Sequence, residues 1–224
     1  MHTHLLERDP TRPVRVMVSV HGTGGSGAEQ LRQLRPSAEE KLSGNWLLVC
    51  PSFETPYQFL LPDADRVLLD ALADLRESHP RLRERLVLHG FSGGAQFAHR
   101  FTLKHPKKVV ACVAFAAGCW TDPDGTAHGM QIDEDWFSRE GWNDPTILAM
   151  AKTGTTDPDA LRKVQWLIGC GQKDHPSRWR SAVEFHARMD AFGADAGWVD
   201  WEGGHEGVTT EVDWRWMKEV DALP

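Results

Sequence analysis

The sequence predicts an α/β protein with a doubly wound, mostly parallel sheet, helices on both of its faces and a small cap insertion. Two patterns predict this class. Short apolar runs rich in β-branched residues recur along the chain, and such unbroken apolarity is typical of strands buried on both faces of a parallel sheet. Segments with helical spacing lie between the runs, and strands that alternate with helices fold through right-handed crossovers. Ligands of such sheets bind at the carboxyl ends of the strands, so the residues that follow each run are the functional candidates.

The predicted main strands are the strongest apolar runs, and they are spread over the whole chain. In chain order they are Val14 to Val20, Trp46 to Cys50, Leu86 to His89, Val109 to Ala117, Val164 to Gly169 and Gly197 to Trp201.

Between these runs, apolar residues at helical spacing predict helices. In the first, Ala64 to His79, the side chains of Val67, Leu68, Leu72 and Leu75 share one stripe. The other predicted helices are Gly94 to Lys104, Arg178 to Phe192 and Thr209 to Val220.

The stretch from Cys119 to Lys163 is irregular and rich in Asp, Pro, Gly and Trp. It predicts either a small cap over the site, with a short helix near Pro145 to Lys152, or a surface excursion. The chain has 224 residues, no internal repeat and no linker-like segment. We therefore expect one domain over residues 1–224, with residues 119–163 as the candidate cap.

Charge and hydropathy restrict the partners. The formal net charge is −7 and no tract is rich in Lys and Arg, so the basic footprint of a nucleic-acid binder is missing. No apolar run approaches the roughly 20 residues that a transmembrane helix needs. Residues 1–13 lack the apolar stretch of a secretory signal. We expect a cytoplasmic protein without a membrane span, and the sequence does not predict its oligomeric state.

The cysteines and histidines predict no metal site. Cys50, Cys112, Cys119 and Cys170 form no CxxC pair and no metal-finger spacing, so we expect buried free thiols. Histidines do follow several predicted strands, but no HxH or HExxH spacing accompanies them. No metal site is therefore expected.

The strongest motif is a Gly-x-Ser-x-Gly pentapeptide. Residues 90–94 read Gly-Phe-Ser-Gly-Gly, directly after a predicted strand and before a predicted helix. This is the context of a nucleophile elbow, in which a serine sits on a strained, tight turn and glycines on either side let the strand and helix cross closely. Ser92 is therefore the predicted nucleophile, at the positive end of the following helix.

A second glycine-rich loop follows the first strong strand. Residues 18–25 read Val-Ser-Val-His-Gly-Thr-Gly-Gly, which contains neither GxGxxG nor GxxxxGK[ST] and so does not match a phosphate loop. It resembles the His-Gly-x-Gly oxyanion loop of esterases in the α/β-hydrolase family, and its place before the elbow matches that family's order. The resemblance implies that the backbone N–H groups of Thr23 and Gly93 form an oxyanion hole.

A serine needs a base, and the base needs an acid that orients it. Asp174 follows the penultimate predicted strand and His205 follows the last, which are the places where the α/β-hydrolase family carries its acid and its histidine. The order Ser, Asp, His is also that of the family. Two alternatives remain open for the acid, Asp122 and Asp124, and one for the base, His175. His21 and His89 are expected to make structural hydrogen bonds beside the site.

The resemblance implies hydrolysis of a small-molecule carboxylic ester through a covalent acyl-enzyme, without a cofactor. The sequence resembles most the compact esterases grouped with polyhydroxybutyrate depolymerase-like and feruloyl-esterase-like proteins. It has few residues before its first strong strand, so leading strands of that fold must be missing or reduced, and residues 4–8 are the candidate for one of them. An amidase or peptidase with the same triad, or a non-catalytic ligand-binding homologue, are the alternatives. The candidate pocket walls are Phe91, Trp120, Trp136, Trp142 and His175.

Overall fold

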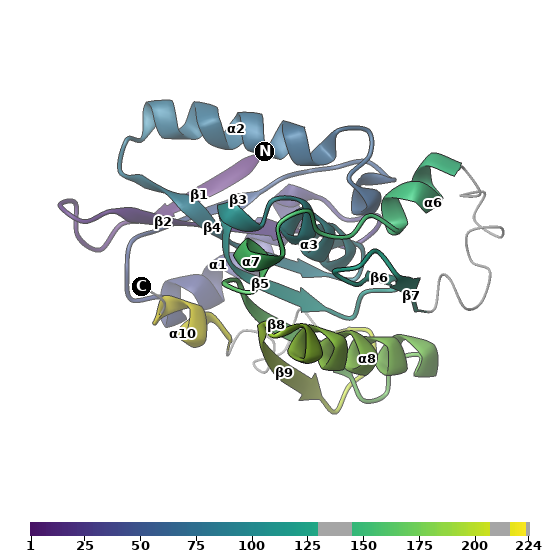
Figure 1. Cartoon of the computed structure of the whole chain (residues 1–224). Coiled ribbons are helices and arrows are strands. Elements are labelled where there is room, and N and C mark those ends of the chain that lie inside the picture. Colours follow the sequence, from purple (N-terminus) through teal and green to yellow (C-terminus); the bar gives the residue numbers. More distant parts are fainter. Residues whose placement is uncertain (130–144, 207–215, 223–224) are drawn as a thin grey trace.

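A seven-stranded sheet runs through the centre of the structure, a computed structural model that describes residues 1–129, 145–206 and 216–222 (Figure 1). The strand order is β1-β3-β2-β4-β5-β8-β9. The first strand pairs antiparallel with β3, and all the following neighbours in this order pair in parallel. The strands are β1 (His2–Leu6), β2 (Val14–Val20), β3 (Trp46–Cys50), β4 (Leu82–Phe91), β5 (Val109–Phe115), β8 (Gln165–Gly171) and β9 (Asp195–Trp201).

Helices connect these strands and cover both faces of the sheet. The helices are α1 (Gly27–Lys41), α2 (Ala64–Ser78), α3 (Gly93–Lys104), α6 (Pro145–Ala151), α7 (Pro158–Leu161), α8 (Pro176–Phe192) and α10 (Trp216–Asp221), with 3₁₀ turns η1 (Tyr57–Phe59) and η2 (Pro106–Lys108). The predicted α/β class with a mostly parallel sheet is therefore confirmed. No described helix combines the length and the apolar character that a membrane span requires.

The alternation of side chains along the strands decides which helix covers which face. Ser19, His89 and Val113 are successive cross-strand partners, so they share one face. Gln30 of α1 donates to the Ser19 hydroxyl at 2.7 Å, and Trp216 of α10 stacks on the His89 ring. On the other face, Phe185 of α8 packs edge-on against Trp166 of β8. Helices α1 and α10 thus cover one face, and α8 covers the other.

The predicted strands and helices are largely confirmed. Each predicted main strand corresponds to a strand in the structure, and the candidate leading strand at residues 4–8 is β1, His2–Leu6. The short helix expected near Pro145 is α6. Of the predicted helix Thr209 to Val220, residues 216–220 lie in α10, and residues 209–215 lie outside the described residues.

The segment after β5 begins with a small hairpin of β6 (Trp120–Thr121) and β7 (Ala127–His128). The Trp120 ring is fully buried and stacks on Phe185 of α8 with ring centroids 4.4 Å apart. Thr121 N donates to Nε2 of His99 on α3 at 3.1 Å. The hairpin is thus fixed between α3 and α8, and residues 130–144 of the candidate cap lie outside the described residues.

The last described helix is tied to the first half of the sheet. The Asp221 carboxylate accepts hydrogen bonds from Ser43 N at 2.8 Å and from Trp46 Nε1 at 2.8 Å. Its backbone carbonyl accepts from Arg15 Nη1 at 2.6 Å. Asp221 therefore joins α10 to the starts of β2 and β3.

The cysteine prediction is confirmed. All four cysteines are free and buried, in the core and not at the surface. Burial raises the pKa of the Cys50, Cys112 and Cys170 thiols to about 12, so these groups stay neutral at ordinary pH.

Candidate active site

Ser92 occupies the turn between β4 and α3 in a strained backbone conformation. Its φ is 56° and its ψ is −116°, a region that few residues other than glycine adopt. A Cβ atom at Gly90 would lie 2.1 Å from Gly94 O, and one at Gly94 would lie 2.1 Å from Val20 O. The glycines are thus required by the close crossing of β4, α3 and the end of β2, which is the elbow geometry that the motif predicts.

A hydrogen-bonded chain starts at this serine. His205 Nε2 lies 3.0 Å from Ser92 Oγ, and His205 Nδ1 lies 2.8 Å from Asp174 Oδ2. An ionised carboxylate only accepts hydrogen bonds, so the proton of the neutral imidazole sits on Nδ1 and Nε2 is free to accept from the serine. The structure therefore brings the predicted nucleophile, base and acid together in the order that proton transfer requires.

Asp174 lies in the loop between β8 and α8, with both carboxylate oxygens engaged. While Oδ2 faces His205, Oδ1 accepts from the backbone N–H of His175 and from Arg178 Nη1, each at 2.6 Å. Burial opposes the negative charge, but the hydrogen bond from His205 and the positive charge and hydrogen bond of Arg178 outweigh it and lower the pKa of Asp174 to about 2. The carboxylate is therefore ionised at any pH at which the protein would work.

The loop that carries His205 is fixed to its neighbours through backbone groups. Trp201 Nε1 donates to Gly204 O at 3.0 Å, and Lys173 N donates to Gly203 O at 3.0 Å. A Cβ atom at Gly171 would lie 2.3 Å from Gly204 O, so the two loops approach closely only because glycines meet there. The Phe91 ring packs against the His205 imidazole with centroids 4.9 Å apart. These contacts set the position and the orientation of the imidazole.

Thr23 and Gly93 lie side by side, and Gly93 directly follows the serine in the chain. A Cβ atom at Gly93 would be 3.0 Å from Thr23 N and 2.5 Å from Thr23 Oγ1, so the two residues are in contact. Gly93 is the first residue of α3, and the first N–H groups of a helix have no acceptor within it. Tyr57 closes this corner, because its hydroxyl donates to His21 O at 2.7 Å. The arrangement fits the predicted oxyanion hole, whose role stays a prediction.

His21 and His89 make the structural hydrogen bonds that were expected of them. His21 Nε2 accepts from Phe53 N at 3.0 Å and Nδ1 donates to Gly22 O at 2.7 Å, which holds the glycine-rich loop after β2. His89 Nδ1 pairs with the Ser19 hydroxyl at 2.7 Å. Burial lowers the pKa of His89 to about 3, so this ring is neutral.

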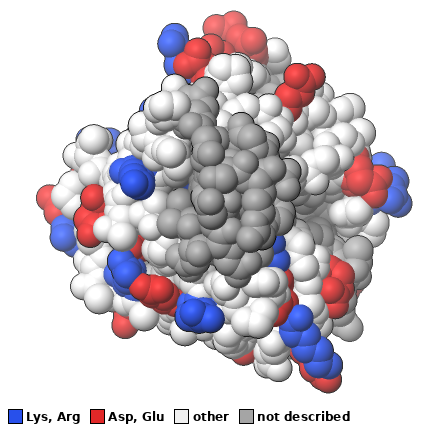
Figure 2. All heavy atoms as spheres, turned by 90° about the vertical axis from the view of Figure 1, so that its right-hand side faces the viewer, with Lys and Arg blue, Asp and Glu red and all other residues white. Residues whose placement is uncertain are grey.

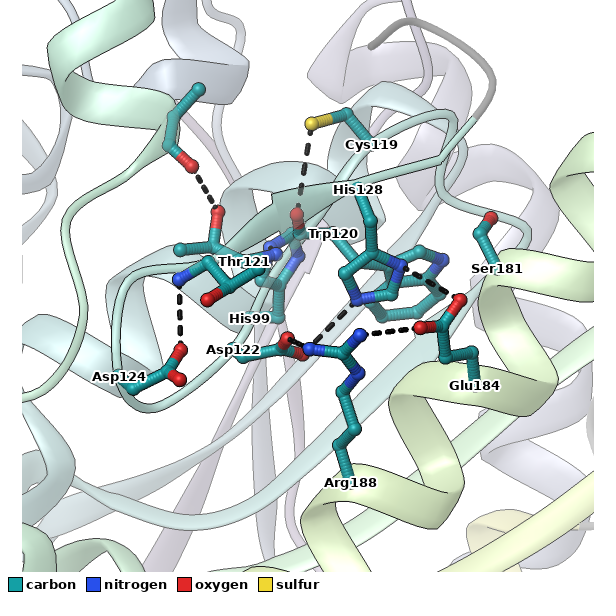
Figure 3. Close-up of polar contacts among 12 residues, drawn as sticks. His99, Cys119, Trp120, Thr121, Asp122, Asp124, His128, Ser181, Glu184 and Arg188 are labelled. Carbon is teal, nitrogen blue, oxygen red and sulfur yellow. Dashed lines mark hydrogen bonds and ion pairs between the residues drawn. The ribbon is translucent and has the colours of Figure 1, made fainter. Parts of the chain in front are cut away.

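The alternative acids belong to the β6–β7 hairpin. Figure 3 shows Asp122 directed toward His128 and Arg188, with Oδ1 3.0 Å from His128 Nε2 and Oδ2 2.5 Å from Arg188 Nη1. Asp124 accepts from Thr126 N at 2.8 Å within the turn of the same hairpin. Neither carboxylate is bonded to His205, so the geometry favours Asp174 as the acid.

The alternative base, His175, has another position. It is the N-cap of α8, where its Nδ1 accepts from Ser177 N at 3.3 Å, and its own N–H donates to Asp174. Its ring therefore does not stand between Asp174 and Ser92, where the His205 ring lies.

The predicted pocket walls divide into three groups. Phe91 lies against His205, and His175 lies beside Asp174, so both border the hydrogen-bonded chain. Trp120 needs correction, because its ring is fully buried between α3 and α8, in contact with Phe185 and His99, and belongs to the core. Trp136 and Trp142 lie outside the described residues.

Sequence reasoning missed two residues at this site, Arg178 and Tyr57. The signal for Arg178 was present, because an acid and an arginine four residues apart at the start of a helix form an ion pair. For Tyr57 no local signal exists, since its contact with the loop after β2 depends on the packing of η1.

On the face that Figure 2 draws, the charged side chains are mixed in sign, and the described residues form no metal-ligand group. Figure 2 shows Lys and Arg side chains interspersed with Asp and Glu around the face that contains the right-hand side of Figure 1. Within residues 1–129, 145–206 and 216–222, no group of three or more His, Cys, Asp or Glu side chains is placed to hold a metal ion.

Comparisons with known proteins show the fold. No protein-family model matches the sequence, and no curated protein matches it either. A fungal esterase from Rhizomucor miehei superposes with a TM-score of 0.66 at 15% identity, over 98% of this chain and 77% of that chain. A fluorophosphonate-binding serine hydrolase of Staphylococcus aureus, FphF, gives 0.62 at 14% identity, over 98% and 89%. A ferulic acid esterase gives 0.60 at 16% identity, over 99% and 90%. The chain thus shares the α/β-hydrolase fold of these proteins, as the motifs predict.

Proposed function

We propose that this protein is a serine hydrolase that cleaves small carboxylic esters through a covalent acyl-enzyme. The observation that carries the proposal is the unbroken hydrogen-bonded chain from Ser92 Oγ through His205 to Asp174, which starts on a strained elbow. Esterases and serine hydrolases among the proteins of the same fold support it. Fold alone does not determine function, so the argument depends on the site.

In the first half of the proposed reaction, Ser92 Oγ attacks the ester carbonyl carbon while its proton passes to His205 Nε2. The carbonyl oxygen becomes an oxyanion, which the N–H groups of Thr23 and Gly93 stabilise. When the carbonyl re-forms, the bond to the alcohol breaks and His205 gives its proton to the departing oxygen. The product of this half is the acylated serine and free alcohol.

In the second half, a water molecule takes the place of the alcohol. His205 removes its proton, the hydroxide attacks the acyl carbon, and the acid leaves as Ser92 recovers its proton. Asp174 stays ionised throughout and stabilises the imidazolium that forms in each half. No step requires a group that these residues do not supply.

The first test compares Ser92→Ala with the wild type, in fluorophosphonate labelling and in p-nitrophenyl acetate hydrolysis. We expect both labelling and turnover to disappear in the variant, because the nucleophile is gone. Ser78→Ala, which alters an exposed serine of α2, is the control and should label like the wild type. A wild type that neither labels nor turns over the ester would contradict the proposal.

The acid is tested with a matched pair of buried carboxylates. Asp174→Asn should lower kcat by about 10³–10⁴-fold, because an amide does not fix the imidazole tautomer or stabilise its charge. Asp122 is a hairpin carboxylate that also has two close partners, His128 and Arg188. Asp122→Asn should therefore leave kcat within a few fold of the wild type. Equal losses in the two variants would exclude Asp174 as the acid. A p-nitroanilide of the same acyl group, tested beside the ester, separates an esterase from an amidase.

A further inference from the structure

Besides His205, Asp174 has a second partner, the charged side chain of Arg178, and this contact is close and buried. Arg178 Nη1 lies 2.6 Å from Asp174 Oδ1, with the arginine side chain 12% exposed and the aspartate side chain 1% exposed. Arg178 is in the first turn of α8, and Asp174 lies in the loop two residues before this helix, so the loop and the start of the helix together place the guanidinium beside the carboxylate. The ion pair is therefore a built part of the site and not a surface contact.

The two oxygens of the carboxylate face different partners. Arg178 and the His175 N–H hold Oδ1, and this leaves Oδ2 to His205 Nδ1. A carboxylate held at one oxygen by fixed donors loses the freedom to rotate, so the other oxygen keeps a constant direction toward the imidazole. Arg178 thus determines the geometry of an interaction in which it takes no direct part.

The guanidinium and His205 bond the same carboxylate, Arg178 at Oδ1 and His205 at Oδ2. A cation beside the carboxylate offsets part of its negative charge, and it opposes the arrival of a second positive charge on the imidazole. His205 must be neutral to accept the serine proton, so the charge of Arg178 favours the form of the imidazole that the proposed mechanism needs.

Other titratable groups of the described loops near the site have contacts of their own. Lys173 pairs with exposed Glu202 at 3.0 Å, Glu206 accepts from Gly204 N at 2.7 Å, and His21 is held by Phe53 N. The Cys170 thiol, 3.7 Å from Asp174 Oδ2, is neutral, because burial raises its pKa to about 12. His175 caps α8. Within the described part of the chain, Arg178 is the cation bonded to the Asp174 carboxylate.

We propose that Arg178 is a positioning residue of the site: it fixes Asp174 toward His205, and its charge sets the acid limb of the pH–rate profile. The inference rests on the proposed function, since the profile is that of ester hydrolysis. The charge and the geometry have separate consequences, and two substitutions distinguish them.

The test measures kcat/KM for p-nitrophenyl acetate from pH 4 to pH 9 in Arg178→Gln and Arg178→Lys. In Arg178→Gln the acid limb should move to higher pH by about one unit, because the opposing charge is removed. In Arg178→Lys the acid limb should stay, whereas kcat on the plateau should fall about tenfold, because an ammonium group does not hold the carboxylate as the planar guanidinium does.

Arg188→Gln is the matched control. Arg188 lies on the same helix and binds a buried aspartate, Asp122, at 2.5 Å, but it has no contact with Asp174. Its loss should leave the acid limb where it is. Thermal unfolding shows that each variant is folded before its profile is compared. An unmoved acid limb in folded Arg178→Gln, or equal shifts in the glutamine and lysine variants, would overturn the proposal.

A second readout keeps this inference separate from the proposed function. The ring protons of His205 can be followed by NMR as pH changes, in the wild type and in Arg178→Gln, without any substrate. A higher midpoint for the titration of this ring in Arg178→Gln supports the role of Arg178 even if the wild type hydrolyses no ester. An unchanged midpoint overturns it even if the esterase activity is found.

Discussion

Next to Ser92, the site depends on a glycine, Gly93, which has no side chain. Gly93 follows the serine, and a Cβ atom there would lie 2.5 Å from Thr23 Oγ1 and 2.9 Å from the Tyr57 hydroxyl. These distances are shorter than real Cβ contacts, so Thr23 or Tyr57 must shift to admit a larger residue. On the proposed mechanism, such a shift disturbs the oxyanion hole that Thr23 and Gly93 form.

We therefore expect Gly93→Ala to lower kcat for p-nitrophenyl acetate by about 10²–10³-fold, the usual cost of losing one oxyanion donor. KM should change little, because the donors act mainly on the oxyanion. Gly22→Ala is the control, since a Cβ atom at Gly22 meets its nearest neighbour at an ordinary 3.6 Å. If Gly93→Ala keeps wild-type kcat, the oxyanion hole lies elsewhere.

Single residues also show how far the sequence predicts the site. Ser92, Asp174 and His205 could be proposed from the sequence because each stands in a loop whose glycines or flanking strand leave a local signal, and the structure places the three side chains in one hydrogen-bonded chain. The tertiary structure alone shows that Trp120 turns into the core, because its partner Phe185 is far away in the sequence. Trp120 and Phe91 both adjoin strong strands, and nothing local distinguishes a core ring from a pocket wall.

At the scale of elements, α2 and α3 are joined through one buried carboxylate. Asp65 in the first turn of α2 bonds His105 Nε2 at 2.6 Å and Lys104 Nζ at 2.8 Å, both at the end of α3. Burial opposes its charge, but the hydrogen bonds and charges of His105 and Lys104 outweigh it and lower the pKa of Asp65 to about 2.

A depressed pKa makes stability depend on pH with a definite sign. The unfolded chain binds a proton at Asp65 near pH 4 and the folded chain only near pH 2, so the stabilisation is complete above pH 4 and is lost as pH falls to about 2. Asp65→Asn should therefore lower the free energy of unfolding at pH 7 by about 2 kcal/mol. It should also flatten the decline between pH 4 and pH 2.

Urea unfolding at several pH values measures both effects. Asp74→Asn, an exposed position on the same helix, is the control and should change neither quantity. An Asp65→Asn protein with wild-type stability and a wild-type pH slope would show that the contacts of Asp65 with His105 and Lys104 contribute nothing to the free energy of unfolding.

Helix α1 shows why some elements escape sequence analysis. It was not predicted, and Pro36 lies inside it, which breaks the helical pattern and removes one backbone donor. Its buried face consists of Gly27, Gln30, Leu34 and Ala38, so only one large apolar residue marks it. The helix forms because its face packs on β1, β2 and β3. Similarly, β4 starts at Leu82, earlier than predicted, and the sequence hides this start because residues 83–85 are exposed and charged.

At the scale of the whole molecule, Asp221 joins the two ends of the described fold. Besides Ser43 and Trp46, its carboxylate accepts from Gly44 N at 3.4 Å, and its carbonyl binds Arg15. These bonds join α10 to β2 and β3, which are far from it in the chain. Their loss should therefore lower the stability of the whole fold.

We expect Asp221→Ala to lower the free energy of unfolding by about 2–3 kcal/mol, because Ser43, Gly44 and the buried Trp46 ring lose their shared acceptor at once. For a protein of this length the change corresponds to a fall in Tm of roughly 5–10 °C. Ester hydrolysis at 20 °C should be unchanged, since no residue of the Ser92 chain is touched. Asp159→Ala is the control, because its carboxylate is 88% exposed. A Tm within one or two degrees of the wild type would count against this role of Asp221.

The hydrogen bond between Ser92 and His205 joins residues 113 positions apart in the chain. Ribosomes add about 5–20 residues per second, so roughly 6–23 s separate the synthesis of the nucleophile from that of its base. During this interval β2, β4 and the elbow can form around a serine that has no partner to activate it. On the proposed mechanism the nascent chain therefore hydrolyses no ester. Hydrolysis begins only when β9 and the loop that carries His205 have left the ribosome and joined the sheet.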